Sequence, residues 1–301
     1  MTAAPIAVPQ RNDARLGIAL MFLACVVFTL QDGLSRHLAE ATNVYMVVMV
    51  RFWFFAGFVI ALARARQGSV RAAARTAQPL LQAFRAVLLV AEICVTIYAF
   101  TLLGLAQSHA LFAACPLLIA ALSGPLLGER VGWRRWTAIG VGLLGILIIL
   151  RPGVAVFDPA ALIALGGALM FALYSLLTRL AARRDSTATS FFWTGTVGAL
   201  AMTAVGMFHW EPMSAPDWAL MAILCVTGVA GHWLLIKCYE VAEASVVQPF
   251  AYLQLVFASA LGVTVFGEVL HPTTVLGAAI VVAAGLFTLW RERVRTQRSA
   301  E

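Results

Sequence analysis

The sequence predicts an all-α integral membrane protein with ten transmembrane helices, arranged as two inverted repeats of five helices each. The first observation is composition, because 62% of the 301 residues are hydrophobic and only 12% are charged, whereas a soluble domain is about half apolar and a quarter charged. The second is a series of apolar stretches about as long as a helix that crosses a bilayer. The third is an internal duplication of the sequence.

Ten apolar segments follow one another along the chain. The third and fourth are separated only by Gly104-Leu105-Ala106-Gln107. Residues 80–127 are nevertheless too many for one span, so we expect a turn between them. The ten segments are 16–37, 44–63, 80–103, 107–127, 134–150, 158–180, 189–208, 217–237, 244–266 and 271–290.

Two short sequence motifs each recur in the second half of the chain and indicate the duplication; we call each recurrence an echo. Leu127-Gly128-Glu129-Arg130 closes one apolar segment, and Phe266-Gly267-Glu268-Val269 closes another 139 residues later. A second echo, at an offset of 143, aligns Phe28, Leu30, Leu34, Ser35 and Arg36 with Phe171, Leu173, Leu177, Thr178 and Arg179. The expected divisions are a cytoplasmic tail at 1–15, repeats at 16–150 and 158–290, and a basic cytoplasmic tail at 291–301.

The positive charges predict the orientation in the inner membrane. With the N-terminus inside, 17 lysines and arginines fall in cytoplasmic segments, whereas only Arg36 and Arg151 fall in outer loops. This bias is typical of a multi-pass protein with cytoplasmic loops rich in basic residues, so both termini are expected in the cytoplasm. It also explains the net charge of +7 without nucleic-acid binding. Basic loops are instead expected to attract anionic membrane lipid.

Five spans per repeat is an odd number, so the second copy enters the membrane from the opposite side. Inverted repeats of this kind can rock about an axis in the membrane plane, which is a mechanism of alternating access. The pattern therefore favours a secondary transporter over a receptor or a channel.

From residue 16 to residue 290 the chain resembles the EamA-type branch of the drug/metabolite transporter superfamily. The matching features are the Gly-Glu pair that closes the fourth span of each half, Arg151-Pro152-Gly153 after the fifth span, and Ala244-Ser245 at the start of the ninth. The chain departs from the pattern at Leu255, where the second half lacks the proline that the first has at Pro116. We therefore expect a kink in the first half only.

The resemblance implies transport of a small organic molecule. Members of this group carry amino acids and their derivatives, vitamins and cofactors such as riboflavin or S-adenosylmethionine, and chelating metabolites. The alternatives are a lipid flippase and a membrane receptor or scaffold that transports nothing. The sequence has no nucleotide-binding loop, no metal-ligand spacing and no nucleophile elbow, so we expect neither an enzyme nor a resident metal or cofactor. The five cysteines all fall in apolar segments, as small buried residues do.

Three ionisable residues inside the spans are the main candidates for a substrate or coupling site: Glu92, Arg51 and Asp32. A charge at a helix centre costs roughly 2.5–3.5 kcal/mol on insertion scales, so each should face a partner or a wet cavity. Glu92, near the middle of the third span, is either a proton-coupling or amine-binding carboxylate or a structural one. Arg51 either binds a substrate carboxylate or pairs with Asp32 or Glu92. Arg85 is expected to snorkel toward the cytoplasm.

Further polar and aromatic residues complete the predicted cavity. His232 and the ninth-span residues Gln248, Tyr252 and Gln254 either orient a ligand or make interhelical hydrogen bonds. A second group either walls a pocket for a ring-bearing substrate or belongs to an interfacial aromatic belt: Tyr98, Tyr174, Trp193 and Trp233. Outside the cavity, His109 is expected at the outer interface. Glu129 and Glu268 are expected to make capping or gating contacts rather than to bind substrate.

Overall fold

The described part of the chain consists of helices joined by short turns. The computed structural model describes residues 13–128, 132–150, 158–242 and 247–300, and these contain no strand. The helices are α1 (Ala14–Ala41), α2 (Val44–Gln67), α3 (Val70–Ala74), α4 (Pro79–Leu103), α5 (Leu105–Phe112), α6 (Cys115–Leu127), α7 (Trp133–Leu150), α8 (Pro159–Ala181), α9 (Thr187–Gly206), α10 (Ala215–Val241), α12 (Leu253–Phe266) and α13 (Pro272–Ala300), with the 3-10 helices η1 (Met207–His209) and η2 (Gln248–Tyr252).

These elements supply the ten predicted spans. Seven helical stretches are long and apolar enough to cross a bilayer, and three shorter apolar stretches complete the set: Trp136–Leu150, Phe250–Phe266 and Pro272–Phe287. The predicted turn between the third and fourth spans is present, because α4 ends at Leu103 and Gly104 follows with a φ of 80°. The predicted ten-helix membrane fold is confirmed.

Polar caps and glycines set the ends of the helices. The side chains of Asn43, Ser186 and Ser214 each accept a hydrogen bond from the backbone N–H three residues ahead, which satisfies a donor that the first helical turn leaves free. At the other end, Gly128 and Gly267 follow α6 and α12 with φ values of 75° and 66°, a conformation in which glycine has no Cβ to clash. The glycine of each Gly-Glu echo therefore ends a helix.

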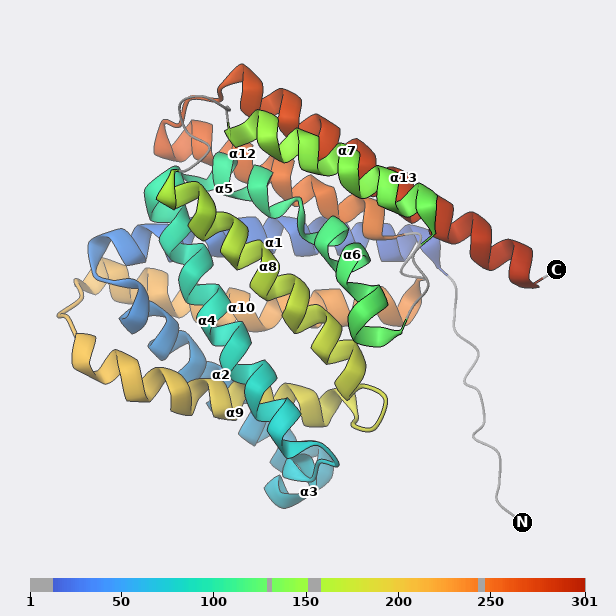
Figure 1. Ribbon diagram of the computed structural model, residues 1–301. Helices are drawn as coiled ribbons and strands as arrows, with labels where there is room; N and C mark the ends of the chain where they lie inside the picture. Colours follow the sequence, from blue (N-terminus) through green and yellow to red (C-terminus); the bar gives the residue numbers. More distant parts are fainter. Residues whose placement is uncertain (1–12, 129–131, 151–157, 243–246, 301) are drawn as a thin grey trace, which may run out of the picture.

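Helices from the two halves pair in a symmetric pattern. The most extensively packed pairs are α7 with α13, α1 with α10, α4 with α8, and α2 with α9, and Figure 1 shows α7 and α13 side by side along one edge of the bundle. Replacing each helix by its counterpart in the other half converts the α1–α10 pair into the α8–α4 pair and leaves α2–α9 and α7–α13 unchanged. A pseudo-two-fold relation between inverted repeats produces this pattern.

The fourth and ninth spans are both interrupted, which corrects the expectation of a kink in the first half only. The fourth span breaks between α5 and α6 at Ala113 and Ala114. The ninth changes from η2 to α12 between Tyr252 and Leu253, which lie 139 residues further along. The second half reaches the same break without a proline at Leu255, because a 3-10 turn takes up the change of helical geometry.

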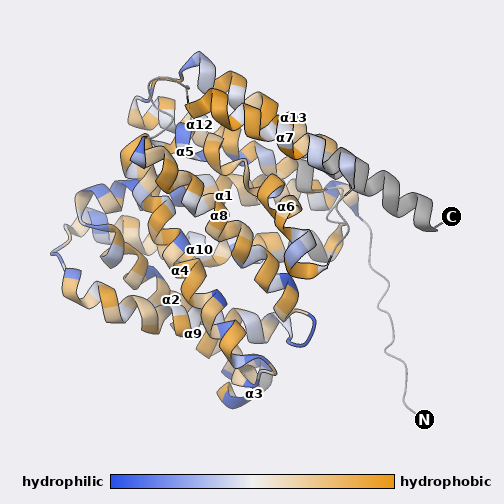
Figure 2. Ribbon diagram, in the orientation of Figure 1, coloured by the Kyte–Doolittle hydropathy of each residue, from blue (hydrophilic) through white to orange (hydrophobic). Residues whose placement is uncertain are grey.

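Apolar side chains cover much of the outer surface of the bundle. Leu200, Leu144 and Val226 are 70%, 59% and 57% exposed, although all three lie within the apolar helical stretches that supply the spans. Figure 2 shows hydrophobic residues along the lengths of the helices and hydrophilic ones gathered at several helix ends and loops. A surface of this kind is stable against lipid, where backbone groups are satisfied within the helices and apolar side chains meet acyl chains.

Candidate functional site

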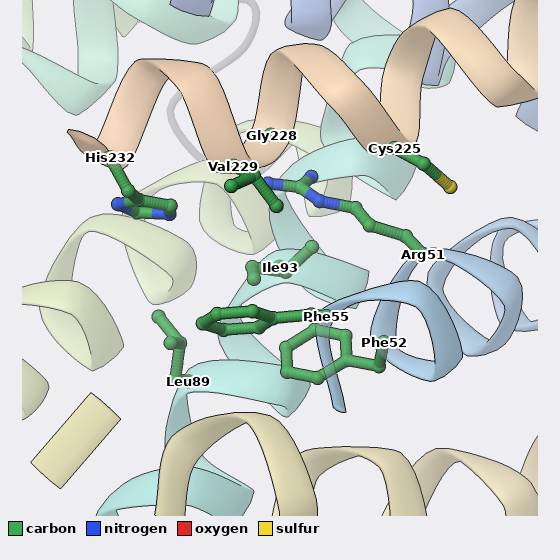
Figure 3. Close-up of a pocket in the computed structure, with 9 residues that line it drawn as sticks. All are labelled: Arg51, Phe52, Phe55, Leu89, Ile93, Cys225, Gly228, Val229 and His232. Carbon is green, nitrogen blue, oxygen red and sulfur yellow. The ribbon is translucent and has the colours of Figure 1, made fainter. Parts of the chain in front are cut away.

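A cavity lies between α2 and α4 of the first half and α10 of the second. We call it the Arg51 cavity, after its charged residue. Its lining consists of Arg51, Phe52, Phe55, Leu89, Ile93, Cys225, Gly228, Val229 and His232. In Figure 3 the Arg51 side chain lies beneath α10 and points toward Gly228. The rings of Phe52 and Phe55 lie on the side of Arg51 that faces away from α10. The cavity therefore draws on both halves of the chain.

Arg51 brings a guanidinium group into this cavity without a counter-ion. A Cβ atom placed on Gly228 would lie 3.5 Å from Nε of Arg51 and 3.4 Å from Oε1 of Gln31, so the guanidinium group lies close to the glycine backbone. Within the described residues, Arg51 makes no hydrogen bond, and no carboxylate oxygen lies within 4.0 Å of it. The predicted alternative, a contact pair with Asp32 or Glu92, is not formed.

Glu92 lies in the same region but points elsewhere. It belongs to α4, is 4% exposed, and accepts a 2.7 Å hydrogen bond from the Thr96 hydroxyl one turn further along the helix. It is absent from the cavity lining, which includes its α4 neighbours Leu89 and Ile93. Glu92 and Arg51 are nevertheless within electrostatic range of each other. A buried carboxyl group with one hydroxyl donor is poorly compensated, which is typical of functional rather than structural carboxyls.

Asp32 is held by partners other than Arg51. Its Oδ2 atom accepts a hydrogen bond from the Gln254 side-chain amide at 3.0 Å and lies 3.1 Å from Nε2 of His109. His109 is 8% exposed and stacks on Phe100 with ring centroids 5.3 Å apart. The expectation of an interfacial His109 is therefore replaced by a buried one, because Asp32 gives its ring nitrogen a partner inside the bundle. Asp32 and Gln254, both predicted site residues, are brought together here.

Arg85 is buried rather than snorkelling, so that expectation is wrong. It is 1% exposed, and its terminal nitrogens donate to oxygens of α4, α8 and α9 at 2.8–3.2 Å: Gln82, Tyr174, Thr178, Ser190 and Thr194. All five acceptors are neutral, and no carboxylate lies within 4.0 Å among the described residues. The five hydrogen bonds satisfy the two terminal nitrogens in place, although Nε is buried without a partner among the described residues, so the side chain need not reach the membrane surface. Tyr174 therefore belongs to this network.

The other predicted residues lie outside the Arg51 cavity, except His232. Tyr98 is 48% exposed on α4, and the indole N–H of Trp193 donates to the backbone oxygen of Ala74 at 3.0 Å. The Tyr252 hydroxyl is buried, has no hydrogen-bond partner within the described residues, and faces Gly285, where a Cβ atom would clash with it. The side chain of Gln248 lies outside the described residues, as do Glu129, Arg151-Pro152-Gly153 and Ala244-Ser245.

Sequence reasoning missed the residues that shape the cavity walls. Phe55 lies one helical turn after Arg51, and the spacing of four residues places the two side chains on one face of α2. That spacing was a usable signal. Gly228 and Gln31 gave no such signal, because an isolated glycine or glutamine in an apolar helix has many structural uses. Only the packing of α10 against α1 and α2 brings Gly228 to the Arg51 guanidinium group.

Two carboxylates join the halves away from the cavity. Glu268, after α12, accepts hydrogen bonds from the backbone N–H groups of Leu105 and Ala106 at 2.7 and 3.0 Å, so it caps the N-terminus of α5 as a negative charge favours. Asp185, between α8 and α9, accepts one from the backbone N–H of Ala77 at 2.9 Å. Both carboxylates come from the second half and bind the backbone of the first. Their loops follow spans that end on opposite faces in the predicted topology.

The EamA-like transporter family matches two stretches of the chain, residues 15–151 and 158–290. The chain belongs to this family. The family resemblance noted from the Gly-Glu echo is thereby confirmed, and the protein is a multi-pass inner-membrane member of a transporter family.

Individual relatives and a solved structure agree with this assignment. The S-adenosylmethionine uptake transporter of Rickettsia prowazekii is 26% identical over 92% of this chain and 93% of its own length. The riboflavin transporter of Vibrio cholerae is 28% identical over 94% of this chain and 95% of its own. A crystal structure of 20% sequence identity matches with a TM-score of 0.62 over 93% of this chain and 98% of the other, which shows a shared fold.

Proposed function

We propose that the protein is a secondary transporter that carries a small organic metabolite across the inner membrane by alternating access. The observation that supports this most strongly is the Arg51 guanidinium group in a cavity between the two halves, where the described residues give it neither a hydrogen bond nor a contact ion pair. Ionisable groups buried in membrane spans are costly, and they mark substrate or ion pathways. A ligand provides the partner that the described residues do not give Arg51.

The mechanism follows from the arrangement of the halves. Residues 16–150 and 158–290 act as inverted repeats that rock against each other, so that the Arg51 cavity faces each side in turn. Both termini remain in the cytoplasm. Transport fits this cavity better than catalysis, because its lining contains one charged group and mostly hydrophobic side chains. Within the described residues no hydrogen bond joins Cys225 to His232, the thiol and imidazole of the lining.

The substrate is an amino acid or a derivative of one, a vitamin or cofactor, or a chelating metabolite. The relatives' names make S-adenosylmethionine and riboflavin the first two molecules to test. Glu92 is the candidate for proton coupling, because it is a buried carboxyl within electrostatic range of Arg51. When Glu92 gains or loses a proton, the charge next to the cavity changes as the cavity opens to one side of the membrane and then to the other.

The test is a transport screen in proteoliposomes that contain the purified full-length protein. Uptake of labelled S-adenosylmethionine, riboflavin and a metabolite mixture is measured with and without a proton gradient. We expect protein-dependent uptake or counterflow of at least one solute, and loss of that transport in Arg51→Ala. Arg64→Ala is the matched control, because Arg64 is an exposed arginine at the end of the same helix. Movement of fluorescent phospholipid without movement of any soluble metabolite would instead identify a flippase.

A further inference from the structure

Arg51 is the one charged side chain among the nine described residues that line its cavity, and its N–H donors have no partner in the described part of the chain. A guanidinium group presents five N–H donors in a planar fork, and none is used by the described residues. The two nearby carboxyls are engaged elsewhere. Glu92 accepts from Thr96, and Asp32 contacts Gln254 and His109.

The walls around this fork are flat and apolar. The rings of Phe55 and His232 lie within 9° of parallel with their centroids 6.4 Å apart, and both line the cavity with Phe52 (Figure 3). Leu89, Ile93 and Val229 supply the remaining hydrophobic surface. Flat aromatic faces bind other unsaturated rings in offset-stacked or edge-to-face arrangements. The cavity therefore combines a fork for an anion with surfaces for a planar hydrophobic body.

We propose that the transported molecule carries a carboxylate, which the Arg51 guanidinium group binds, and a planar unsaturated ring, which lies against Phe55 and His232. This inference rests on the proposed transport function and narrows its substrate class. A guanidinium fork matches a carboxylate through two parallel N–H···O bonds. A neutral ligand of the same shape leaves the buried guanidinium group unpaired, so it should bind more weakly than the acid. In the same way, a site that hydrogen-bonds a polar group of its substrate rejects an analogue that lacks this group.

Substitution of Gly228 tests the same site by a change of shape alone. A methyl group at this position would meet Gln31 Oε1 at 3.4 Å and Arg51 Nε at 3.5 Å, which are ordinary contact distances, so Gly228→Ala is compatible with the fold. The added methyl occupies space beside the guanidinium group without changing any charge. A ligand that binds the fork should therefore lose affinity in Gly228→Ala as well as in charge variants of Arg51.

The experiment compares matched acids and amides on the purified full-length protein. The probes are nicotinate with nicotinamide, indole-3-acetate with indole-3-acetamide, and phenylacetate with phenylacetamide, each titrated while binding is followed by the melting temperature and by tryptophan fluorescence. We expect at least one acid to bind, and its amide to bind about tenfold more weakly or worse, as the loss of a charge-assisted pair predicts. Arg51→Met should abolish the difference in affinity between acid and amide. Arg51→Lys and Gly228→Ala should lower the affinity for the acid, and Arg64→Met should leave that affinity unchanged.

Three outcomes would overturn the inference: amides that bind as tightly as their acids, acids that bind Arg51→Met as tightly as the wild type, or no response to any acid. These outcomes are separable from failure of the proposed function. If a neutral metabolite is transported and Arg51→Lys does not change that transport, the proposed transport function stands and the proposed carboxylate site is wrong. If acids bind in a way that depends on Arg51 but nothing is transported, the carboxylate site stands and the proposed transport function is wrong.

Discussion

Glu268 pairs with Arg36 and connects the end of the ninth span to the end of the first. The carboxylate also accepts the N–H groups of Leu105 and Ala106. Glycines at positions 104 and 262 make room for it, since a Cβ atom at either would lie 2.5 Å from a Glu268 oxygen. The guanidinium group of Arg36 in turn lies 4.2 Å over the ring of Phe266. One carboxylate therefore holds three helices together at this end of the bundle.

Replacing Glu268 with glutamine should lower stability. The neutral amide keeps the volume but loses the charge that attracts Arg36 and the α5 N-terminus, so we expect a loss of about 1–3 kcal/mol and a lower melting temperature in detergent. Glu40→Gln is the control, because Glu40 also contacts Arg36 at 2.9 Å but is 42% exposed, and exposed pairs contribute about 0–1 kcal/mol. Equal losses in both variants would show that the cap is unimportant.

Arg85→Lys should destabilise the junction of α4, α8 and α9. A lysine ammonium is compact and has three donors, so it cannot replace a fork that makes five hydrogen bonds to neutral oxygens. Buried acceptors left without donors cost about 1–3 kcal/mol each, and we expect a total loss of roughly 2 kcal/mol or more. Arg64→Lys is the conservative control on an exposed arginine. A melting temperature equal to that of the control would contradict this role for the network.

Much of the fold was accessible from the sequence, because it depends on periodic and repeated features. Apolar segments predicted the spans, and the Gly-Glu echo identified the helix ends at Gly128 and Gly267. The interruption at Tyr252 was missed, because its cause is a local 3-10 geometry rather than the proline that marks the fourth span. Which helices pack together was not predicted, and the symmetric pairing of the two halves appeared only in the structure.

The site was less predictable, because its outcome depends on which charges meet. Sequence position placed Arg51 and Asp32 at similar depth and Glu92 near the middle of its span, but it contained nothing about the direction in which each side chain points. The Asp32 carboxylate contacts His109 rather than Arg51, and the Thr96 hydroxyl donates a hydrogen bond to one oxygen of Glu92. Arg85 was assigned to the membrane surface by its nearness to the end of the span, whereas four of its five acceptors come from α8 and α9, some 90 to 110 residues away.

Asp185 should give a pH-dependent contribution to stability. Partial burial raises the pKa of its carboxyl group, but hydrogen bonds from Thr76, Gln82 and Ala77 outweigh that effect and hold the pKa below its usual value. The stabilisation is therefore complete above the unfolded-state pKa of about 3.9 and is lost as pH falls through the lower folded-state pKa. We expect Asp185→Asn to melt below the wild type near neutral pH, and the two melting curves to converge below about pH 4.

A double variant tests whether that effect depends on the hydrogen bond from Thr76 to Asp185. Thr76→Val removes the hydroxyl donor, so its effect should be smaller in an Asp185→Asn background than in the wild type, as expected for residues in one network. Additive effects, or a difference between wild type and Asp185→Asn that persists unchanged at low pH, would assign the contribution to something other than this carboxylate.

Reporter fusions should place both chain ends in the cytoplasm. The excess of basic residues in the predicted inner segments orients the helices, so alkaline phosphatase fused after residue 301 should be inactive and a fluorescent protein should be bright. Fusion after residue 270, in the loop between the ninth and tenth spans, should reverse both signals. Phosphatase activity from the full-length fusion would contradict the ten-span orientation.

Glu92 provides the test of proton coupling. Its carboxyl group is 4% exposed and has one hydroxyl donor, so burial favours the neutral acid, whereas the Arg51 guanidinium group within electrostatic range favours the carboxylate. A ligand carboxylate on Arg51 cancels that positive charge and shifts the balance toward proton uptake. Substrate binding and protonation of Glu92 are then linked, which is the requirement for coupled transport.

Glu92→Gln keeps the hydrogen bond to Thr96 possible but cannot exchange a proton. We expect this variant to retain counterflow of labelled against unlabelled substrate, because exchange needs no net proton movement, and to lose the stimulation of uptake by a pH gradient. Both measurements are made in the same proteoliposomes as the wild type, with melting temperatures to confirm folding. Asp32→Asn is the comparison, since Asp32 already has His109 and Gln254 as partners. Identical pH-gradient dependence in the wild type and Glu92→Gln would exclude Glu92 as the coupling group, and loss of counterflow together with normal folding would make it a substrate-binding residue instead.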